Sequence, residues 1–267
     1  MAESYKAGFI GCGNMGGALI RASVRTTDPG KICVTDQFME KAQELSAACG
    51  VQAVSIETAA ETSSFIFLGV KPQHMEHMLS QIREILENRE DRFVLVTMAA
   101  GLTMEKIRSF SGNYPIIRIM PNLPASVNEG VILYDSLDTT EAEVDAFVNL
   151  LKKAGKLIPL PESQIDAGSA VSGCGPAFVC LFAEAMADAA VELGITRKNA
   201  YDLAYQTLLG TAKLLLETGQ HPGELKDAVC SPGGTTIAGV MALEKGAFRS
   251  TVSDAVRQAY KKTLDLK

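Results

Sequence analysis

The sequence has no basic cluster, no long apolar run and no N-terminal leader pattern, and each absence excludes a class of function. Its 267 residues carry 25 Lys and Arg against 31 Asp and Glu, a net charge of −6. Nucleic acids and anionic membrane surfaces bind basic patches, so neither is expected as a partner. No apolar run approaches the ~20 residues that span a bilayer, so no membrane helix is expected. The first predicted strand starts within a few residues of Met1, which leaves no room for a signal or transit peptide.

The six cysteines and three histidines lack the spacing of a metal site. There is no Cys-x-x-Cys pattern and no Cys/His cluster, so no metal ion is expected. His74 and His77 lie three residues apart on a predicted helix, which is more typical of a solvated face. The chain is long and 47% hydrophobic, so it does not need disulfides to fold. We therefore expect reduced, mostly buried thiols and a cytoplasmic protein.

What the sequence does contain, through residue 162, is an alternation of short apolar runs with helical patterns. This alternation predicts an α/β Rossmann domain over residues 1–162, with a mostly parallel sheet and helices on both faces. Ligands of such sheets bind at the carboxyl ends of the strands. We expect strands at residues 7–10, 31–35, 65–70, 93–97, 116–120, 131–133 and 156–160, and helices at residues 15–25, 39–49, 75–87, 104–110 and 140–154.

No strand pattern remains after Pro161, and residues 163–267 are predicted to form an all-α second domain. Its helix from Gly175 is apolar on nearly every side, and such a helix must be buried on every side. Only about 100 residues of helix are available to cover it, so we expect a partner subunit, as a homodimer or a higher homo-oligomer. The predicted helices cover residues 163–171, 175–194, 198–219, 222–229, 235–245 and 248–264.

The first predicted strand leads directly into a G-x-G-x-x-G segment and then into a helical pattern. Strand, glycine turn and helix are the context that the dinucleotide fingerprint requires. Gly11 permits the tight turn, Gly13 lets the backbone approach a pyrophosphate, and Gly16 allows close packing of helix on strand. The cofactor-binding candidates of this segment are Ile10, Gly11, Cys12, Gly13, Asn14 and Met15.

Asp36 follows the second predicted strand, close to the acidic position that binds the adenosine ribose in the fingerprint. A carboxylate there accepts hydrogen bonds from the ribose hydroxyls of NADH and repels the 2′-phosphate of NADPH. Lys41 lies about one helical turn further on and is able to offset that repulsion. An alternative is that Asp36 faces solvent or caps the next helix. The expected cofactor is NADPH or NADH, with use of NADH at least comparable to that of NADPH.

Three further strand ends carry loops of small residues and prolines, which suit the close approach of a flat ring. Lys71 is equally consistent with a catalytic acid, a phosphate contact or a solvated charge. The remaining cofactor-binding candidates are Val70, Lys71 and Pro72 after the third strand, Met98, Ala99 and Ala100 after the fourth, and Asn122 after the fifth.

The segment Ser231-Pro232-Gly233-Gly234-Thr235-Thr236 lies between two helical patterns. One proline and two glycines predict a tight loop with little side-chain cover, and the threonines lie where a helix begins. Free backbone N–H groups at the positive end of a helix suit a small anion such as a carboxylate. The alternative is an ordinary helix-to-helix turn capped by Thr. The substrate-binding candidates are Ser231, Gly233, Gly234, Thr235 and Thr236.

Along its whole length the chain resembles pyrroline-5-carboxylate reductases. The resemblance rests on GFIGCGNMGGAL, GVKPQ, MAAGLT, RIMPNLPASVNEG, VSGCGPAF, QTLLGTAKLLLETGQHPGELKDAVCSPGGTTIAG and ALEKGAFRS. It implies a Rossmann domain, an all-α C-terminal domain and an interlocked dimer, and it implies reduction of 1-pyrroline-5-carboxylate to L-proline. It also implies that the SPGGTT loop binds the substrate, with Thr236 at the catalytic threonine position. Asp36 and Ile56 lie at positions that leave the cofactor preference open.

Reduction of a cyclic imine fits these residues, because a protonated imine already attracts hydride and needs little acid catalysis. A β-hydroxyacid dehydrogenase is disfavoured, since the helix that follows Gly173-Cys174-Gly175 lacks the lysine needed as a base. A deazaflavin-dependent reductase would share the N-terminal pattern but leave the SPGGTT loop unexplained. A different class, a non-enzymatic NAD(P)-sensing dimer, would not need the second polar corner. Another cyclic imine acid as the preferred substrate also stays open.

Overall fold

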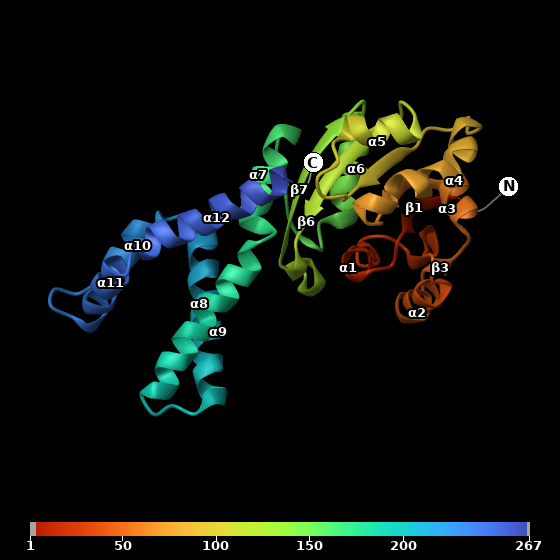
Figure 1. Ribbon diagram of the computed structural model, residues 1–267. Coiled ribbons are helices and arrows are strands. Elements are labelled where there is room, and N and C mark those ends of the chain that lie inside the picture. Colours follow the sequence, from red (N-terminus) through yellow and green to blue (C-terminus); the bar gives the residue numbers. More distant parts are fainter. Residues whose placement is uncertain (1–3, 266–267) are drawn as a thin grey trace. The chain divides into compact units, whose positions relative to one another are not determined.

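The computed structural model describes residues 4–265 and divides the chain into two compact units (Figure 1). The first unit comprises the chain through Gly173 together with the residues from Tyr260 onward, and the second comprises residues 174–259. Helix α7 (Glu162–Ser172) thus belongs to the first unit by its packing. The domain boundary between residues 162 and 163 stays a prediction.

The first unit is built on one eight-stranded sheet with the order β3-β2-β1-β4-β5-β6-β7-β8. Each neighbouring pair is parallel except β6 and β7, which are antiparallel. The prediction of a mostly parallel sheet is therefore confirmed. The strands are β1 (Tyr5–Ile10), β2 (Ile32–Thr35), β3 (Gln52–Ala53), β4 (Ser63–Leu68), β5 (Val94–Thr97), β6 (Ile116–Pro121), β7 (Gly130–Leu137) and β8 (Gly155–Pro159).

Helices cover both faces of the sheet, and each face has its own apolar cluster. Phe9 and Phe67 stack with ring centroids 4.2 Å apart in the cluster that α1, α2 and α6 complete. Ile10 and Leu68, the next residues of the same strands, belong to the cluster of α3, α4 and α5. Both faces are buried, which is why these strands are continuous apolar runs. The helices are α1 (Asn14–Ser23), α2 (Met39–Cys49), α3 (Ile56–Thr62), α4 (Met75–Glu87), α5 (Met104–Ser111) and α6 (Glu141–Leu151), with short 3-10 helices η1 (Pro29–Lys31), η2 (Pro72–His74) and η3 (Leu123–Val127).

Besides the short 3-10 helices, one strand and one helix of the first unit were not expected from the sequence, and one pair of neighbouring strands is antiparallel. The two-residue strand β3 and the seven-residue helix α3 are too short to show a period of 2 or 3.6. The N-cap Ser55, which accepts a hydrogen bond from the N–H of Thr58, was the one local signal for α3. β7 is antiparallel to β6 because the eight residues between them are too few for a parallel crossover.

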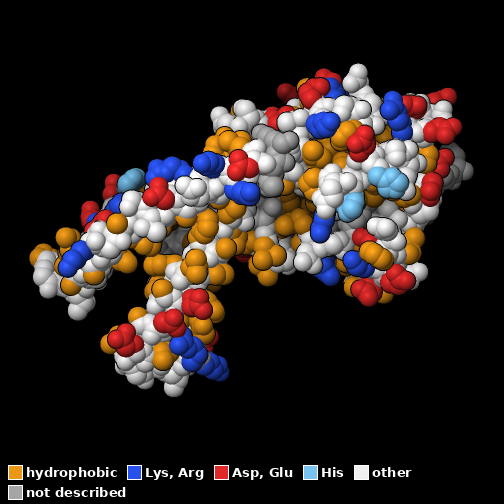
Figure 2. All heavy atoms as spheres, in the orientation of Figure 1, with side chains coloured by type: hydrophobic (Ala, Val, Ile, Leu, Met, Phe, Trp, Pro, Cys, Tyr) orange, Lys and Arg blue, Asp and Glu red, His pale blue; other side chains and the backbone are white. Residues whose placement is uncertain are grey.

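In the second unit, the described residues form helices and no strands: α8 (Gly175–Glu192), α9 (Arg197–Thr218), α10 (Pro222–Ala228), α11 (Thr235–Lys245) and most of α12 (Phe248–Leu264). Along the 18 residues of α8, Ala183 and Ala187 are buried. Large hydrophobic side chains on these helices are exposed, and Figure 2 shows them gathered on this part of the chain. Examples are Val179, Leu181, Leu203, Leu209, Leu216 and Met241.

By length and composition alone, one stretch of the described chain is apolar enough to cross a membrane. It covers Glu162–Glu192, and 17% of its most apolar window is buried in the single chain. The expectation that no stretch reaches this threshold was therefore wrong. The stretch includes α8, which is rich in Ala, Val and Phe and has little charge.

Candidate active site

The glycine loop after β1 has the geometry predicted for a dinucleotide turn. Gly11 has a φ of 111°, and a Cβ placed on it would lie 2.6 Å from the carbonyl oxygen of Gly69. A Cβ on Gly16 would lie 2.2 Å from the carbonyl oxygen of Gly11. Both positions therefore require glycine. Around Gly13 no atom lies within 4 Å of such a Cβ, so its backbone is open to a ligand.

Helix α1 begins directly after this loop, and its N-terminus is not capped by a side chain. Gly13 is the N-cap residue, and Asn14 and Met15 open the first turn. The first N–H groups of the helix are therefore available to a ligand, at the positive end of the helix dipole. This is the arrangement that holds pyrophosphate in Rossmann folds.

Asp36 joins the glycine loop to the turn after β2. One of its carboxylate oxygens, Oδ2, accepts a hydrogen bond from the N–H of Cys12 at 2.7 Å, and the other, Oδ1, accepts from Phe38 at 3.0 Å. The carboxylate is half-buried and retains lone pairs for further donors. It therefore fixes the loop, and the ribose role of Asp36 stays a prediction.

A hollow of about 410 Å³ lies between α1 and α2 beside the glycine loop. Its lining includes Cys12 and Gly13, the cationic side chains of Arg21 and Lys41, and the carboxylate of Glu44. Neither cation pairs with a carboxylate among residues 4–265. Sequence reasoning missed Arg21 as a site residue. The spacing of four residues from Gly13 to Gly17 to Arg21, which places all three on one side of α1, was the available signal.

Cys12 lies in the same loop, but its thiol is not reactive at neutral pH. Its thiol contacts the carbonyl oxygen of Thr35 at 3.5 Å. Burial, and to a smaller extent the nearby charge of Asp36, raises the pKa of the Cys12 thiol to about 12. The thiol is therefore protonated at neutral pH and contributes shape rather than nucleophilic chemistry.

The other predicted cofactor residues follow the carboxyl ends of β4, β5 and β6, at the same edge of the sheet as the glycine loop. Val70 packs against the core, whereas Lys71 is exposed. Asn122 is buried, donates from Nδ2 to the carbonyl oxygen of Ser172 and accepts at Oδ1 from the N–H of Val131, both at 2.8 Å. Its amide therefore ties α7 and β7 to the end of β6. The other residues of these loops are Pro72 in η2 and Met98, Ala99 and Ala100 after β5.

The SPGGTT segment forms an open corner at the start of α11 in the second unit. Gly233 has a φ of 68°, and a Cβ on Gly234 would lie 2.2 Å from the Oγ of Ser231. Gly234, not a threonine, is the N-cap residue, and no side chain caps the helix. Thr235 and Thr236 occupy the first turn and are exposed. The turn capped by Thr is therefore not formed, and the first N–H groups of α11 are open to an anion.

No group of three or more His, Cys, Asp or Glu side chains within residues 4–265 is arranged to hold a metal ion. The described chain therefore carries two candidate ligand sites of different kinds. One is the glycine loop with its adjoining hollow, in the first unit, and it suits a dinucleotide. The other is the corner at residues 231–236, in the second unit, and it suits a small anion.

Comparison with known families matches both halves of the chain. Residues 162–266 match the family described as pyrroline-5-carboxylate reductase dimerisation. Residues 6–101 match the family described as NADP oxidoreductase coenzyme F420-dependent. The second match covers the shared N-terminal dinucleotide pattern, and the first covers the SPGGTT corner.

Full-length relatives give the same result. Pyrroline-5-carboxylate reductases from Arabidopsis thaliana and Escherichia coli are 40% and 41% identical, covering 99% and 97% of this chain and 96% and 97% of theirs. A solved pyrroline-5-carboxylate reductase from Coxiella burnetii is 31% identical over 99% of both chains, with a TM-score of 0.92. A Plasmodium falciparum pyrroline carboxylate reductase, solved with NADP bound, is 29% identical over 99% of both chains, with a TM-score of 0.85. The chain therefore belongs to the pyrroline-5-carboxylate reductase family, whose members are NAD(P)-dependent oxidoreductases.

Proposed function

We propose that this chain reduces 1-pyrroline-5-carboxylate to L-proline with NADPH or NADH, as the last step of proline synthesis. Full-length similarity to pyrroline-5-carboxylate reductases supports this assignment. The observation in the chain itself that carries the proposal is the uncapped helix start at Gly234 and Thr235. A Rossmann oxidoreductase whose second site binds a small anion suits a carboxylate-bearing substrate.

The dinucleotide is proposed to lie across the carboxyl edge of the sheet. The open backbone of Gly13 and the first N–H groups of α1 hold its pyrophosphate. Asp36, at the end of β2, receives the adenosine ribose, so the ring half extends the other way over β4 and β5. There Val70, Lys71, Pro72, Met98, Ala99 and Ala100 form the wall, and Asn122 holds the end of β6. When bound, the nicotinamide supplies the hydride that adds to the imine carbon.

The corner at α11 is proposed to hold the substrate. The N–H groups of Thr235 and Thr236 face the ring carboxylate, since that of Gly234 donates to the carbonyl oxygen of Ser231 at 3.0 Å. No arginine is needed because the helix dipole favours an anion. Gly233 and Ser231 shape the loop around it. The hydroxyl of Thr236 orients the ring nitrogen, which keeps its proton as the C=N bond becomes a C–N bond. Positioning supplies most of the rate in such a site.

Cofactor selectivity is proposed to arise from opposing charges around the adenosine ribose. Asp36 suits the free hydroxyls of NADH, whereas Arg21 and Lys41 offer a 2′-phosphate two cations that lack carboxylate partners among the described residues. We therefore expect both cofactors to be used, with NADH at least comparable to NADPH.

Steady-state reduction of pyrroline-5-carboxylate with each cofactor tests the function and its selectivity together. Wild type should turn over with both, and Asp36→Ser should shift kcat/KM toward NADPH. If wild type turns over pyrroline-5-carboxylate with neither NADPH nor NADH, the proposed function is contradicted. A strong wild-type preference for NADPH that Asp36→Ser leaves unchanged would contradict only the role of Asp36.

The finer assembly is also a proposal: a homodimer or higher homo-oligomer in the cytoplasm, without nucleic-acid or membrane partners. The match of residues 162–266 to a dimerisation family supports it, because a second copy would cover the apolar faces of α8 and α9. All six cysteines are free thiols, which fits a reducing compartment. Light scattering of the detergent-free protein should give a multiple of the 28.4 kDa chain mass. Recovery from the membrane fraction alone would contradict the proposal.

A further inference from the structure

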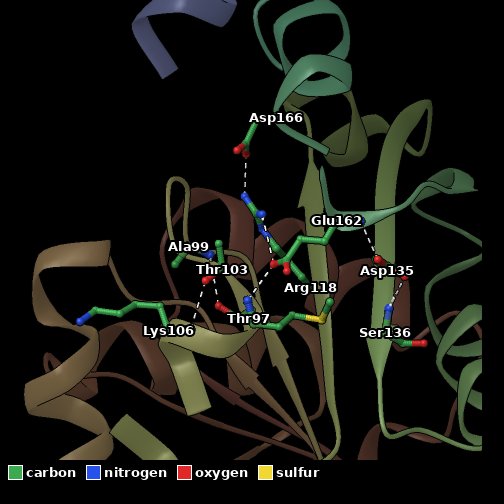
Figure 3. A network of polar contacts seen from close by, with 10 residues as sticks. Thr97, Ala99, Thr103, Lys106, Arg118, Asp135, Ser136, Glu162 and Asp166 are labelled. Atoms are coloured by element: carbon green, nitrogen blue, oxygen red, sulfur yellow. Dashed lines mark hydrogen bonds and ion pairs between the residues drawn. The ribbon is translucent and has the colours of Figure 1, made fainter. Parts of the chain in front are cut away.

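A buried ion network lies in the first unit, between β6 and α7 (Figure 3). Arg118 on β6 is fully buried and donates from Nη2 to Oδ1 of Asp166 at 2.6 Å and from Nη1 to Oε1 of Glu162 at 3.3 Å. Both carboxylates belong to α7. A buried charge is costly unless it is paired, so these contacts hold α7 to β6 in one arrangement.

Glu162 has a second contact that a simple ion pair does not need. Its Oε1 also accepts a hydrogen bond from the N–H of Met104 at 2.7 Å. Met104 is the first residue of α5, so this carboxylate lies at the positive end of that helix. The main chain of Glu162 is fixed as well, because its N–H donates to Oδ2 of Asp135 at 2.6 Å. The carboxylate is thereby held in place from both sides.

These contacts fix the far end of the loop between β5 and α5, residues 98–103. At the near end of the loop, the N–H of Ala99 donates to Oγ1 of Thr97 at 3.4 Å, a long hydrogen bond. At the far end, Thr103 caps α5 by accepting from the N–H of Lys106, and Glu162 accepts from Met104. Ala99 and Leu102 of the loop pack against the apolar cluster of α3, α4 and α5, and the hydrogen bond from Met104 to Glu162 links the residue after the loop to α7.

We propose that Glu162 is a positioning residue, held by Arg118, that keeps the β5–α5 loop in place beneath the nicotinamide end of the cofactor. The proposal rests on the proposed function and deepens it. In the sheet order, β2 and β1 carry the adenosine and pyrophosphate positions, and β5 lies two strands from β1 on the other side. A looser β5–α5 loop therefore affects the ring half of the dinucleotide and not its adenosine half.

The test compares two probes in the intact protein, NADPH and 2′-phospho-ADP-ribose, which lacks the nicotinamide ring. Glu162→Ala should weaken NADPH binding and lower kcat, each by about tenfold, since small displacements of a reacting group are costly. Its affinity for 2′-phospho-ADP-ribose should stay within about twofold of wild type. Glu162→Gln keeps an oxygen that accepts from Met104 and should recover most of the NADPH affinity.

A matched control is Arg92→Met, which removes an ion pair to Glu143 at the amino end of β5. It should lower Tm without changing the affinity for either probe. If Glu162→Ala weakens the binding of both probes equally, or the binding of neither, Glu162 acts only on stability and the inference is overturned. If wild type itself fails to bind NADPH, the proposed function fails instead, so the two failures are distinguishable.

Discussion

The two units of this chain differ in how far their apolar side chains are buried. In the first unit both faces of the sheet are covered, and residues such as Phe9, Phe67 and Ile66 are fully buried. In the second unit the long helices α8 and α9 leave Leu181 66% exposed and Leu209 59% exposed. The first unit therefore completes its own core, whereas the second is built to have its apolar faces covered by another chain.

The same contrast holds for the two candidate sites. The glycine loop is fixed within the first unit by Asp36 and by close backbone contacts of Gly11 and Gly16. The corner before α11 is open, with an uncapped helix start and exposed Thr235 and Thr236. A preformed glycine loop and an open corner before α11 suit the proposed roles of cofactor and substrate sites, with the second site completed on assembly.

The largest expected effect comes from one substitution in each unit. Phe67→Ala should lower the free energy of unfolding by about 3–5 kcal/mol, because it leaves a cavity against Phe9. Leu181→Glu changes an exposed residue, so a lone chain would lose no more than about 0.5 kcal/mol. In the assembled protein it should cause dissociation, measured by light scattering at micromolar concentration. An unchanged oligomer with Leu181→Glu would show that α8 is not covered by a second copy.

Thiol reactivity provides a second test of the difference in burial between the two units. Burial raises the pKa of Cys12 to about 12 and that of Cys33 to about 11, so neither thiol is ionised at pH 8. Cys180 on α8 is exposed in the single chain. Iodoacetamide should therefore modify Cys180 first in dissociated Leu181→Glu protein and more slowly in the wild-type oligomer. Mass spectrometry follows the modification. If Cys180 is modified at the same rate in Leu181→Glu and in wild type, α8 is not covered by another chain.

The raised pKa values of Cys12 and Cys33 also predict a pH dependence of stability. Both thiols are protonated in the folded state at neutral pH, because their folded pKa values lie above the ordinary thiol value of 9.0. The stabilisation that these protonated thiols give is therefore fully present below pH 9 and is lost progressively between pH 9 and about 11 to 12. The free energy of unfolding should fall over that range, and less steeply in Cys12→Ala. An equal slope in the variant would show that Cys12 does not contribute.

Removal of the hydroxyl at the open corner should have a moderate effect. In the proposed binding mode Thr236→Ala loses one hydrogen bond to the ring nitrogen, about 0.5–1.5 kcal/mol, which corresponds to about a two- to thirteenfold loss of kcat. The dissociation constant for NADPH should be unchanged. Thr207→Ala, which removes an exposed hydroxyl bonded to the carbonyl oxygen of Leu203, is the matched control. Wild-type turnover in Thr236→Ala would remove this residue from the mechanism.

The smallest expected effect concerns backbone strain near the start of α12. Ala247 has a φ of 56°, in the left-handed region that favours glycine. Ala247→Gly should therefore stabilise the protein by about 1 kcal/mol at most, since the gain is partly offset by the greater entropy of glycine in the unfolded chain. Gly11→Ala, at a φ of 111° in the first unit, should instead destabilise and weaken dinucleotide binding. If Ala247→Gly has a lower Tm than wild type, the backbone at Ala247 is not strained.

The sequence was sufficient for features encoded in adjacent residues. The glycine loop, the strand and helix pattern of the first unit and the unusual apolar character of α8 are all local patterns, and the structure has each of them. The sequence was not sufficient where distant residues meet. The approach of Arg21 to the hollow depends on how α1 and α2 pack, and the contact of Glu162 with Met104 joins residues 58 positions apart. Neither leaves a periodic signal.

The central claim is that the corner before α11 binds the carboxylate of a cyclic imine that is reduced by NAD(P)H. The most direct measurement is kcat/KM of wild type for pyrroline-5-carboxylate and for 1-pyrroline, the same ring without the carboxylate. The account predicts a loss of about tenfold or more for 1-pyrroline, because the helix start then lacks its anion. Equal kcat/KM values for the two imines would contradict it.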